Sequence, residues 1–256
     1  MALLTVANLS KSFGGVQAVR GVSFTLERGQ LLALIGPNGA GKSTCFNMLN
    51  GQLRPDGGTV VLDGADVTGC PPREIWKRGV GRTFQVAATY GSMTVRENVQ
   101  MVLLSRARRV FDLWSRAGEL YRDQALALLE RVGMAQQAQR PCGVLAYGDV
   151  KRLELAMALA HEPKLLLMDE PTAGMAPKER NALMALTAEL ARERELGVLF
   201  TEHSMDVVFT YAQRVLVLTR GQVIAEGSPA QVRDNPEVQA VYLGTGATFQ
   251  AHAALE

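Results

Sequence analysis

The sequence predicts an α/β fold with an N-terminal antiparallel β region and an inserted helical subdomain. Short strand-like runs alternate with helical patterns over residues 1 to about 84, and again over 161 to about 244. Residues from about 85 to 160 are mostly helical in pattern. No internal repeat or low-complexity linker interrupts the chain, so we expect one domain over 1–256 that ends in a short helix at about 235–244.

The composition is that of a folded protein with a weakly charged surface. Of its 256 residues, 47% are hydrophobic, which is enough for a sizeable core. The formal net charge is only +2, so we expect no nucleic acid partner. Cys45, Cys70 and Cys142 show no C-x-x-C spacing, which argues against a zinc site or a disulfide framework.

The sequence pattern contains neither of two kinds of membrane segment. The first residues, MALLTVANLSKSFGG, lack the charged start and long apolar run of a secretory signal. No apolar run approaches the roughly 18 residues that a membrane-spanning helix needs. We therefore expect a cytoplasmic location, and work at a membrane only through another protein.

A glycine-rich turn predicts a P-loop nucleotide-binding core. LLALIGPNGAGKSTCFNMLNG (31–51) reads as a strand, a turn and a helix, and the turn fits G-x-x-x-x-G-K-[ST] at Gly36, Gly41, Lys42 and Ser43. Glycines let several backbone N–H groups point at one place, and the helix N-terminus adds its positive dipole end. Lys42 can reach terminal phosphates, while the Ser43 hydroxyl can bind the Mg²⁺ that accompanies a nucleoside triphosphate.

A second element, which carries two acidic residues, indicates hydrolysis of the bound nucleotide. In KLLLMDEPTAG (164–174), an apolar strand-like run ends in Asp169 and Glu170. A parallel strand would bring both carboxylates to the carboxyl edge of a sheet. Asp169 is suited to hold Mg²⁺, and Glu170 to orient or deprotonate an attacking water. An acidic pair is usually a solvated turn, but the preceding strand and the upstream phosphate loop favour catalysis. The chain has no N-K-x-D guanine-reading motif, which disfavours a GTPase.

With these elements in place, the chain resembles the ATP-binding subunit of an ABC transporter over nearly its whole length. Five motifs carry the resemblance in order: Walker A in GPNGAGKST (36–44), the Q-loop in RTFQ (82–85), the signature in LAYGD (145–149), Walker B in LLLMDEP (165–171) and the switch histidine region in TEH (201–203). In this family two subunits form a head-to-tail dimer. Each ATP is held between the phosphate loop of one subunit and the signature motif of the other.

The resemblance assigns roles to individual residues. It implies catalytic roles for Lys42, Glu170, His203 and Gln85, and Mg²⁺ ligands from Ser43, Gln85 and Asp169. Gln85 would also lie at the contact with the membrane partner, and His203 would bridge the γ-phosphate and Glu170. The residues implied to contact ATP are Phe13, Gly36, Pro37, Asn38, Gly39, Ala40, Gly41, Lys42, Ser43, Thr44, Tyr147 and Gly148. Phe13 would stack on adenine, with packing under the neighbouring Gly-Gly turn as the alternative.

A finer resemblance is to the branched-chain amino-acid type of ABC importer ATPase. It is carried by LAYG in the signature, AATYGSMTVRENV (87–99), AGMAP (173–177) and VYLG (241–244). It implies that ATP hydrolysis powers uptake through separate transmembrane permease subunits, with a second ABC ATPase subunit completing a homo- or heterodimer. The chain would then lie on the inner face of the plasma membrane, bound through the permease. We expect residues 105–123 to form an amphipathic surface helix or loop.

The signature region departs from the family pattern. Ala146 lacks the usual serine hydroxyl, Tyr147 stands where glycine is common, and Asp149 replaces Gln or Glu. We expect Asp149 to cap the following helix. Ala176 replaces an Asp or Asn, which puts communication between the two ATP sites in doubt. We therefore expect slow hydrolysis by the isolated chain, and a partner ATPase subunit with a fuller signature at one of the sites.

Three alternative functions compete with this interpretation. An ABC ATPase for another cargo, such as urea, another polar solute or an exported lipid, would look alike, because cargo never touches this subunit. A soluble ABC protein acting on nucleic acid or ribosomes usually has two cassettes or a long coiled-coil insert, and this chain has one cassette and no heptad run. A non-catalytic interaction module conflicts with the intact set of Lys42, Asp169, Glu170 and His203.

Overall fold

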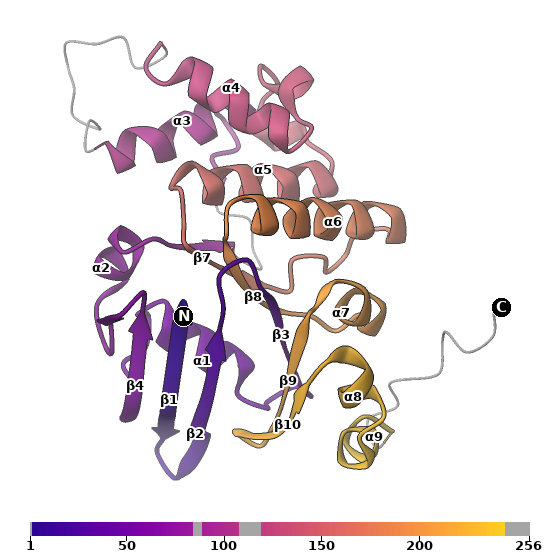
Figure 1. The fold of residues 1–256 in the computed structure, drawn as a ribbon. Coiled ribbons are helices and arrows are strands. Elements are labelled where there is room, and N and C mark those ends of the chain that lie inside the picture. Colours follow the sequence, from indigo (N-terminus) through magenta and orange to yellow (C-terminus); the bar gives the residue numbers. More distant parts are fainter. Residues whose placement is uncertain (1, 84–88, 108–118, 244–256) are drawn as a thin grey trace, which may run out of the picture.

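The computed structural model describes residues 2–83, 89–107 and 119–243. They form two sheets with helices packed around them, and a helical layer extends from one end of the larger sheet (Figure 1). The predicted α/β class is confirmed.

The smaller sheet is the predicted N-terminal antiparallel region. Its strands run in the order β2-β1-β4-β5, with bounds Leu4–Phe13 (β1), Val16–Leu26 (β2), Gly57–Leu62 (β4) and Ala65–Asp66 (β5). The central strand β1 pairs antiparallel with both β2 and β4, so that Leu4 lies opposite Leu26 on one side and Leu62 on the other. All three leucines are buried.

The larger sheet carries the candidate site. Its order is β10-β9-β3-β8-β7-β6, with bounds Leu31–Ile35 (β3), Val80–Thr83 (β6), Leu165–Asp169 (β7), Gly197–Thr201 (β8), Arg214–Thr219 (β9) and Gln222–Gly227 (β10). Strands β6, β7, β8, β3 and β9 are parallel, and β10 is antiparallel to β9. Because carboxyl ends of parallel strands share one edge, the residues that follow β3, β7 and β8 come together there.

Strand β3 is buried on both faces. Leu31, Ala33 and Ile35 belong to a core shared with the helical layer. The alternating residues Leu32 and Leu34 belong to a second core, shared with the antiparallel sheet and with helix α1 (Lys42–Leu49). This is why the run reads as continuously apolar instead of alternating.

The middle of the described chain is helical. Helices α3 (Val95–Arg106), α4 (Arg122–Arg131) and α5 (Tyr147–Ala160) pack against one another, and two short 3₁₀ turns, Ala135–Gln137 and Cys142–Val144, precede α5. Helix α3 begins with a capping box, in which the Thr94 hydroxyl accepts from the Glu97 N–H and the Glu97 carboxylate accepts from the Thr94 N–H. Most of the predicted 105–123 segment lies outside the described residues.

The remaining helices cover the larger sheet and close the chain. They are α2 (Pro72–Lys77), α6 (Pro177–Glu193), α7 (Met205–Tyr211), α8 (Pro229–Arg233) and α9 (Pro236–Leu243). Across the three described stretches, none of the helices combines the length and the apolar character required to traverse a bilayer.

Candidate active site

The phosphate loop follows β3 and requires glycine at two positions. Gly36 has φ 152° and Gly41 has φ 104°, a region that disfavours residues with a Cβ. A Cβ at Gly36 would lie 2.0 Å from the carbonyl oxygen of Leu218, and one at Gly41 would lie 2.5 Å from that of Ala18. The backbone of β9 and β2 therefore presses directly on the loop.

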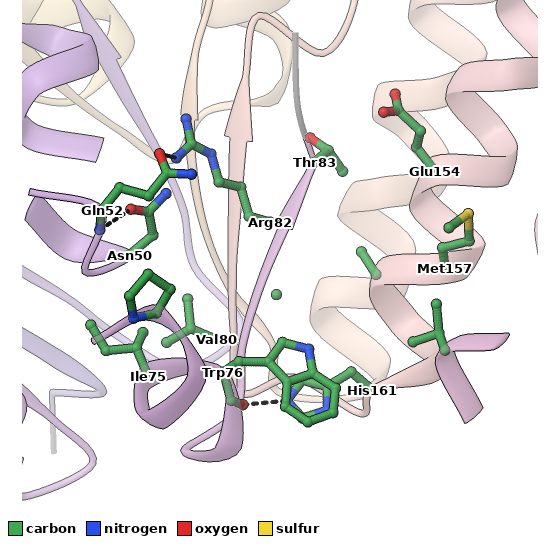
Figure 2. A pocket seen from close by; sticks show the side chains of 14 residues that line it. Asn50, Gln52, Ile75, Trp76, Val80, Arg82, Thr83, Glu154, Met157 and His161 are labelled. Carbon is green, nitrogen blue, oxygen red and sulfur yellow. Dashed lines mark hydrogen bonds between the residues drawn. The ribbon is translucent and has the colours of Figure 1, made fainter. Parts of the chain in front are cut away.

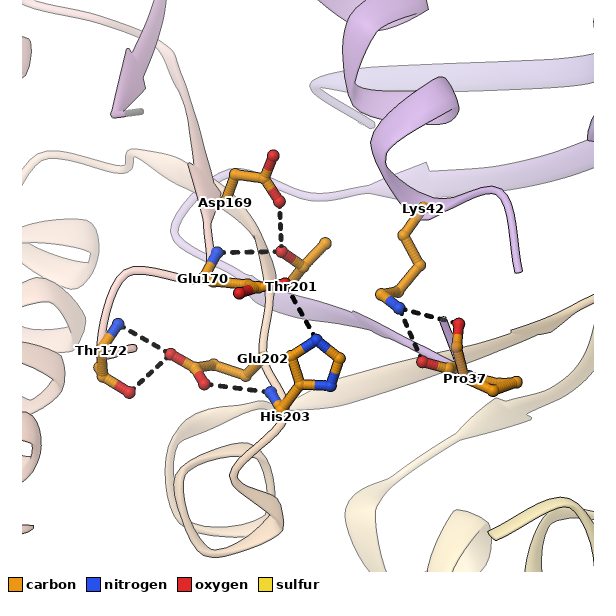
Figure 3. A network of polar contacts seen from close by, with 9 residues as sticks. Pro37, Lys42, Asp169, Glu170, Thr172, Thr201, Glu202 and His203 are labelled. Atoms are coloured by element: carbon orange, nitrogen blue, oxygen red, sulfur yellow. Dashed lines mark hydrogen bonds and ion pairs between the residues drawn. The ribbon is translucent and has the colours of Figure 1, made fainter. Parts of the chain in front are cut away.

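Lys42 closes the loop from the first turn of α1. Its side chain is buried, and Nζ donates to the carbonyl oxygens of Gly36 (2.7 Å) and Pro37 (3.1 Å). Burial lowers the pKa of Lys42, while the nearby carboxylates of Glu170 and Asp169 act in the opposite direction. Figure 3 shows the Lys42 ammonium group directed at the loop carbonyls near Pro37, with Asp169 and Glu170 on the neighbouring strand end.

Part of the loop is open to solvent. Asn38, Gly39 and Ser43 are exposed, Pro37 and Thr44 are half-buried, and Ala40 is buried. The loop is thus accessible to a ligand on the side that bears the Ser43 hydroxyl.

Asp169 and Glu170 are tied to the neighbouring strand through Thr201. The Thr201 hydroxyl donates to Oδ1 of Asp169 (2.7 Å) and accepts from the backbone N–H of Glu170 (3.0 Å). Thr201 is fully buried at the end of β8. One hydroxyl therefore fixes both acidic residues, as the dashed lines in Figure 3 show.

His203 contacts the second of these acids. Its Nε2 lies 2.9 Å from Oε1 of Glu170, and the imidazole is half exposed. Glu170 itself has φ 48°, an uncommon conformation for a residue with a side chain. The structure thus brings together Lys42, Asp169, Glu170 and His203 at one sheet edge, as expected from the motifs.

Two supporting groups were not singled out from the sequence. The buried Glu202 carboxylate accepts from the backbone N–H (2.9 Å) and hydroxyl (2.6 Å) of Thr172, and from the N–H of His203 (3.1 Å). It thereby links the turn after β7 to the turn after β8. Arg82 at the end of β6 lies 3.5 Å from Oδ2 of Asp169. Both residues stand inside quoted motifs, but their partners are distant in sequence.

Tyr147 and Gly148 lie at the start of α5. A Cβ at Gly174 would lie 3.5 Å from the Tyr147 ring, and one at Gly148 would lie 3.1 Å from the Glu179 carboxylate. Tyr147 is exposed and Gly148 is buried.

The prediction that Asp149 caps α5 is wrong. The N-cap is Ala146, and Asp149 is the third residue of the helix. Its carboxylate instead accepts from Nε2 of Gln137 at 3.0 Å. A carboxylate within the first turn still interacts favourably with the helix dipole, which explains its tolerance there.

Phe13 and Gln85 are the remaining predicted site residues, and Tyr242 is a contact of the loop that was not predicted. Phe13 ends β1 and is 50% exposed, with Lys11 Nζ 5.8 Å from its ring centroid, so the ring is available for contact and is not packed under the turn. Gln85 lies outside the described residues. Burial raises the pKa of Tyr242 in α9, although a backbone hydrogen bond from Gly36 opposes that shift. The C-terminal helix therefore reaches the phosphate loop, which the motifs did not reveal.

The donor set fits Mg²⁺. This ion prefers oxygen ligands and is commonly held by one or two protein groups together with substrate phosphates. Ser43 offers an exposed hydroxyl, and Asp169 a half-buried carboxylate already oriented by Thr201. Among the described residues, no three His, Cys, Asp or Glu side chains gather into a metal-binding cluster, so the protein has no all-protein cage here.

Comparisons of the sequence with known proteins identify its family. The profile of the ABC transporter family matches residues 19–173, and that of the branched-chain amino acid ATP-binding cassette transporter matches 222–248. The chain is 39% identical over 249 residues to the high-affinity branched-chain amino acid transport ATP-binding protein BraF of Pseudomonas aeruginosa, covering 94% of this chain and 98% of BraF. It is 39% identical over 251 residues to LivG of Escherichia coli, with the same coverage. The lipopolysaccharide export ATP-binding protein LptB of Haemophilus influenzae is 36% identical over 244 residues, covering 95% of this chain and 98% of LptB.

Solved structures of ABC transporter cassettes have the same fold as this chain. The ADP conformation of MJ1267, an ATP-binding cassette of an ABC transporter, superposes with a TM-score of 0.85 at 32% identity, covering 95% of this chain and 99% of that one. The dimeric structure of MJ0796, a bacterial ABC transporter cassette, gives a TM-score of 0.75 at 26% identity, covering 88% and 98%. The resemblance inferred from the motifs is confirmed: the chain belongs to the ABC transporter family, as one of its ATP-hydrolysing subunits.

Proposed function

We propose that this chain powers the uptake of branched-chain or related amino acids through a separate membrane permease. The match of residues 222–248 to the branched-chain type supports this cargo class, as do the relatives named for such transport. The contact of Glu170 with His203 beside Lys42 is the observation that carries the catalytic part of the proposal.

ATP would bind with its phosphates in the loop that Gly36 and Gly41 shape. Lys42 Nζ now donates to two carbonyl oxygens, and phosphate oxygens would be stronger acceptors for the same ammonium group. Ser43 and Asp169 would hold Mg²⁺, which neutralises charge on the β- and γ-phosphates when bound.

Glu170 and His203 would act on the water that attacks the γ-phosphate. The Glu170 carboxylate accepts that water's proton or orients it, while His203 holds the carboxylate through the 2.9 Å contact. The Thr201 hydroxyl keeps the Glu170 backbone in place during the step. Positioning of this kind supplies most of the rate enhancement in phosphoryl transfer.

We further propose a head-to-tail dimer, in which Tyr147 and Gly148 face the nucleotide of the opposing subunit. Phe13 would stack on the adenine bound to its own subunit. Because Ala146 offers no hydroxyl, the opposing site would lose one charge-assisted hydrogen bond, a cost of about 1.5–3 kcal/mol. A partner ATPase subunit with a serine at that point would make the other site stronger.

The permease would dock beside β6. A cavity of about 280 Å³ opens there between α2, β6 and α5, lined by apolar side chains such as Ile75, Val80 and Met157 (Figure 2). At its base the imidazole of His161 stacks on the indole of Trp76, with ring centroids 3.8 Å apart. Thr83 lines the cavity and immediately precedes the segment that holds Gln85. The chain would thereby be held on the inner face of the plasma membrane.

A second cargo class has one observation in its favour. The export protein LptB is 36% identical, close to the value for the amino acid relatives. Urea or another polar solute would use the same ATPase chemistry.

The hydrolytic role is tested by Glu170→Gln. ATP binding should persist while turnover falls by about 10²–10⁴-fold, the contribution of a general base. Glu189→Gln on the exposed face of α6 is the matched control and should leave turnover unchanged. Full turnover in Glu170→Gln would remove this residue from the mechanism.

The cargo is tested with the chain, its permease and any partner ATPase subunit in proteoliposomes. ATP-dependent accumulation of labelled leucine, isoleucine or valine is expected. Accumulation of none of them, with ATP turnover intact, would refute the amino acid assignment.

A further inference from the structure

Helix α5 contains a buried ion pair that the site chemistry does not use. Lys151 Nζ lies 2.9 Å from Oε2 of Glu154, and the two side chains are only 3% and 5% exposed. Desolvating two charges is costly, and such pairs are often no more stabilising than apolar residues of similar size. A contribution to the stability of the fold is therefore a poor explanation for the presence of this ion pair.

The lysine also contacts the signature turn. Its Nζ lies 5.6 Å from the centroid of the Tyr147 ring, within the range of a cation–π interaction. Residues 147, 151 and 154 are spaced four and three apart, so they lie along one face of α5. On another side, the same ring lies against Gly174, where a Cβ would be 3.5 Å away. Tyr147 is thus held between the ion pair and the turn after β7.

The other end of the pair reaches the cavity beside β6. Glu154 and Met157 line the cavity from one helix, and Thr83 lines it from the facing strand (Figure 2). A single row of three side chains therefore connects the cavity wall with the first residue of α5.

We propose that Lys151 and Glu154 are positioning residues for Tyr147, holding its ring in the orientation in which the signature turn meets the nucleotide of an opposing subunit. This inference rests on the proposed dimeric ATPase. The charge of Glu154 keeps the Lys151 ammonium over the ring. A displacement of Glu154 at the cavity wall would then shift the Tyr147 ring without any movement of the phosphate loop.

The first test uses the isolated chain. Nitration of Tyr147 by tetranitromethane, followed by mass spectrometry, should proceed at a rate different from the parental one in Lys151→Met and in Glu154→Gln, because the ammonium group beside the ring affects both its access and the ionisation on which nitration depends. Lys151→Arg keeps a cation over the ring and should restore the parental rate. Glu74→Gln breaks an exposed ion pair of the same spacing on α2, and should leave the rate unchanged. Equal nitration in all variants would overturn the proposal, whether or not the chain hydrolyses ATP.

The second test is a double-mutant cycle in the complex with the permease. Glu154→Gln should raise KM for ATP by roughly three- to thirty-fold, the factor a cation–π contact supports, with kcat changed less than about twofold. ATP affinity of the isolated subunit should stay at the parental value. Combined with Tyr147→Ala, the Glu154→Gln change should add nothing.

The outcomes separate the two proposals. Additive effects in the double variant, in a parent complex that turns over ATP, would refute the positioning role and leave the proposed function intact. A parent complex without ATP turnover would refute the proposed function, and the nitration rates would still decide the positioning role.

Discussion

Thr201→Val should weaken both the fold and catalysis, because one hydroxyl serves two acidic residues. Valine matches threonine in shape but cannot donate to Asp169 or accept from the Glu170 N–H. Losing a hydrogen bond to a charged group costs about 1.5–3 kcal/mol, and losing a neutral one about 0.5–1.5 kcal/mol. The expected loss is therefore about 2–4.5 kcal/mol, or roughly 4–18 °C in Tm for a chain of this size.

Urea denaturation and steady-state ATP hydrolysis check this prediction. Turnover should fall about 10- to 100-fold, because the backbone of the catalytic carboxylate loses its anchor. Thr187→Val is the matched control: Thr187 is equally buried, but its hydroxyl donates to the Leu183 carbonyl within α6, away from the site. It should cost under about 1.5 kcal/mol and leave turnover intact. Equal effects of both substitutions on turnover would refute the anchoring role of Thr201.

Two further predictions concern the loop and the cavity. Gly36→Ala should abolish ATP binding in a fluorescence assay, because its Cβ would lie 2.0 Å from the Leu218 carbonyl oxygen, whereas Gly57→Ala, whose Cβ would have no neighbour closer than 4.0 Å and whose φ is not left-handed, should retain binding. Retained binding in Gly36→Ala would contradict the close approach. Burial lowers the pKa of His161, with Arg106 adding to the shift and a hydrogen bond to the Trp76 carbonyl opposing it. The unfolded chain then takes up the proton first, so stability is fully present above pH about 6.5 and lost below it. His161→Phe should flatten the pH dependence of the unfolding free energy between pH 7 and 5.5. An unchanged slope would show that His161 is not the source of that pH dependence.

The local parts of the site could be predicted because the residues that form each part are adjacent in the sequence. Gly36 to Ser43 combine a turn, a helix start and a lysine within one short run. Asp169 and Glu170 follow an apolar run whose strand character was evident. In both cases the parallel sheet then brings the residues to one edge.

The non-local parts could not be predicted. Arg82 meets Asp169 and Glu202 meets Thr172 across intervals that no spacing rule covers. The expected cap at Asp149 failed because the helix begins two residues earlier, at Tyr147, so Asp149 lies inside the first turn, where its carboxylate accepts from Gln137. A helix start signal in the sequence shows which local hydrogen bonds a side chain is able to make. The tertiary structure determines which of those hydrogen bonds forms.

The double-sided burial of β3 has a consequence for how the molecule responds to its ligand. The strand that ends in the nucleotide loop packs into two cores, so unfolding of this strand would remove packing from both cores at once. ATP at a hundred times its Kd adds about 2.7 kcal/mol to the folded state, and this gain should protect amides throughout both layers. Conversely, a packing defect at Phe24 in the antiparallel sheet would weaken the apparent ATP affinity only once it leaves a sizeable fraction of the molecules unfolded.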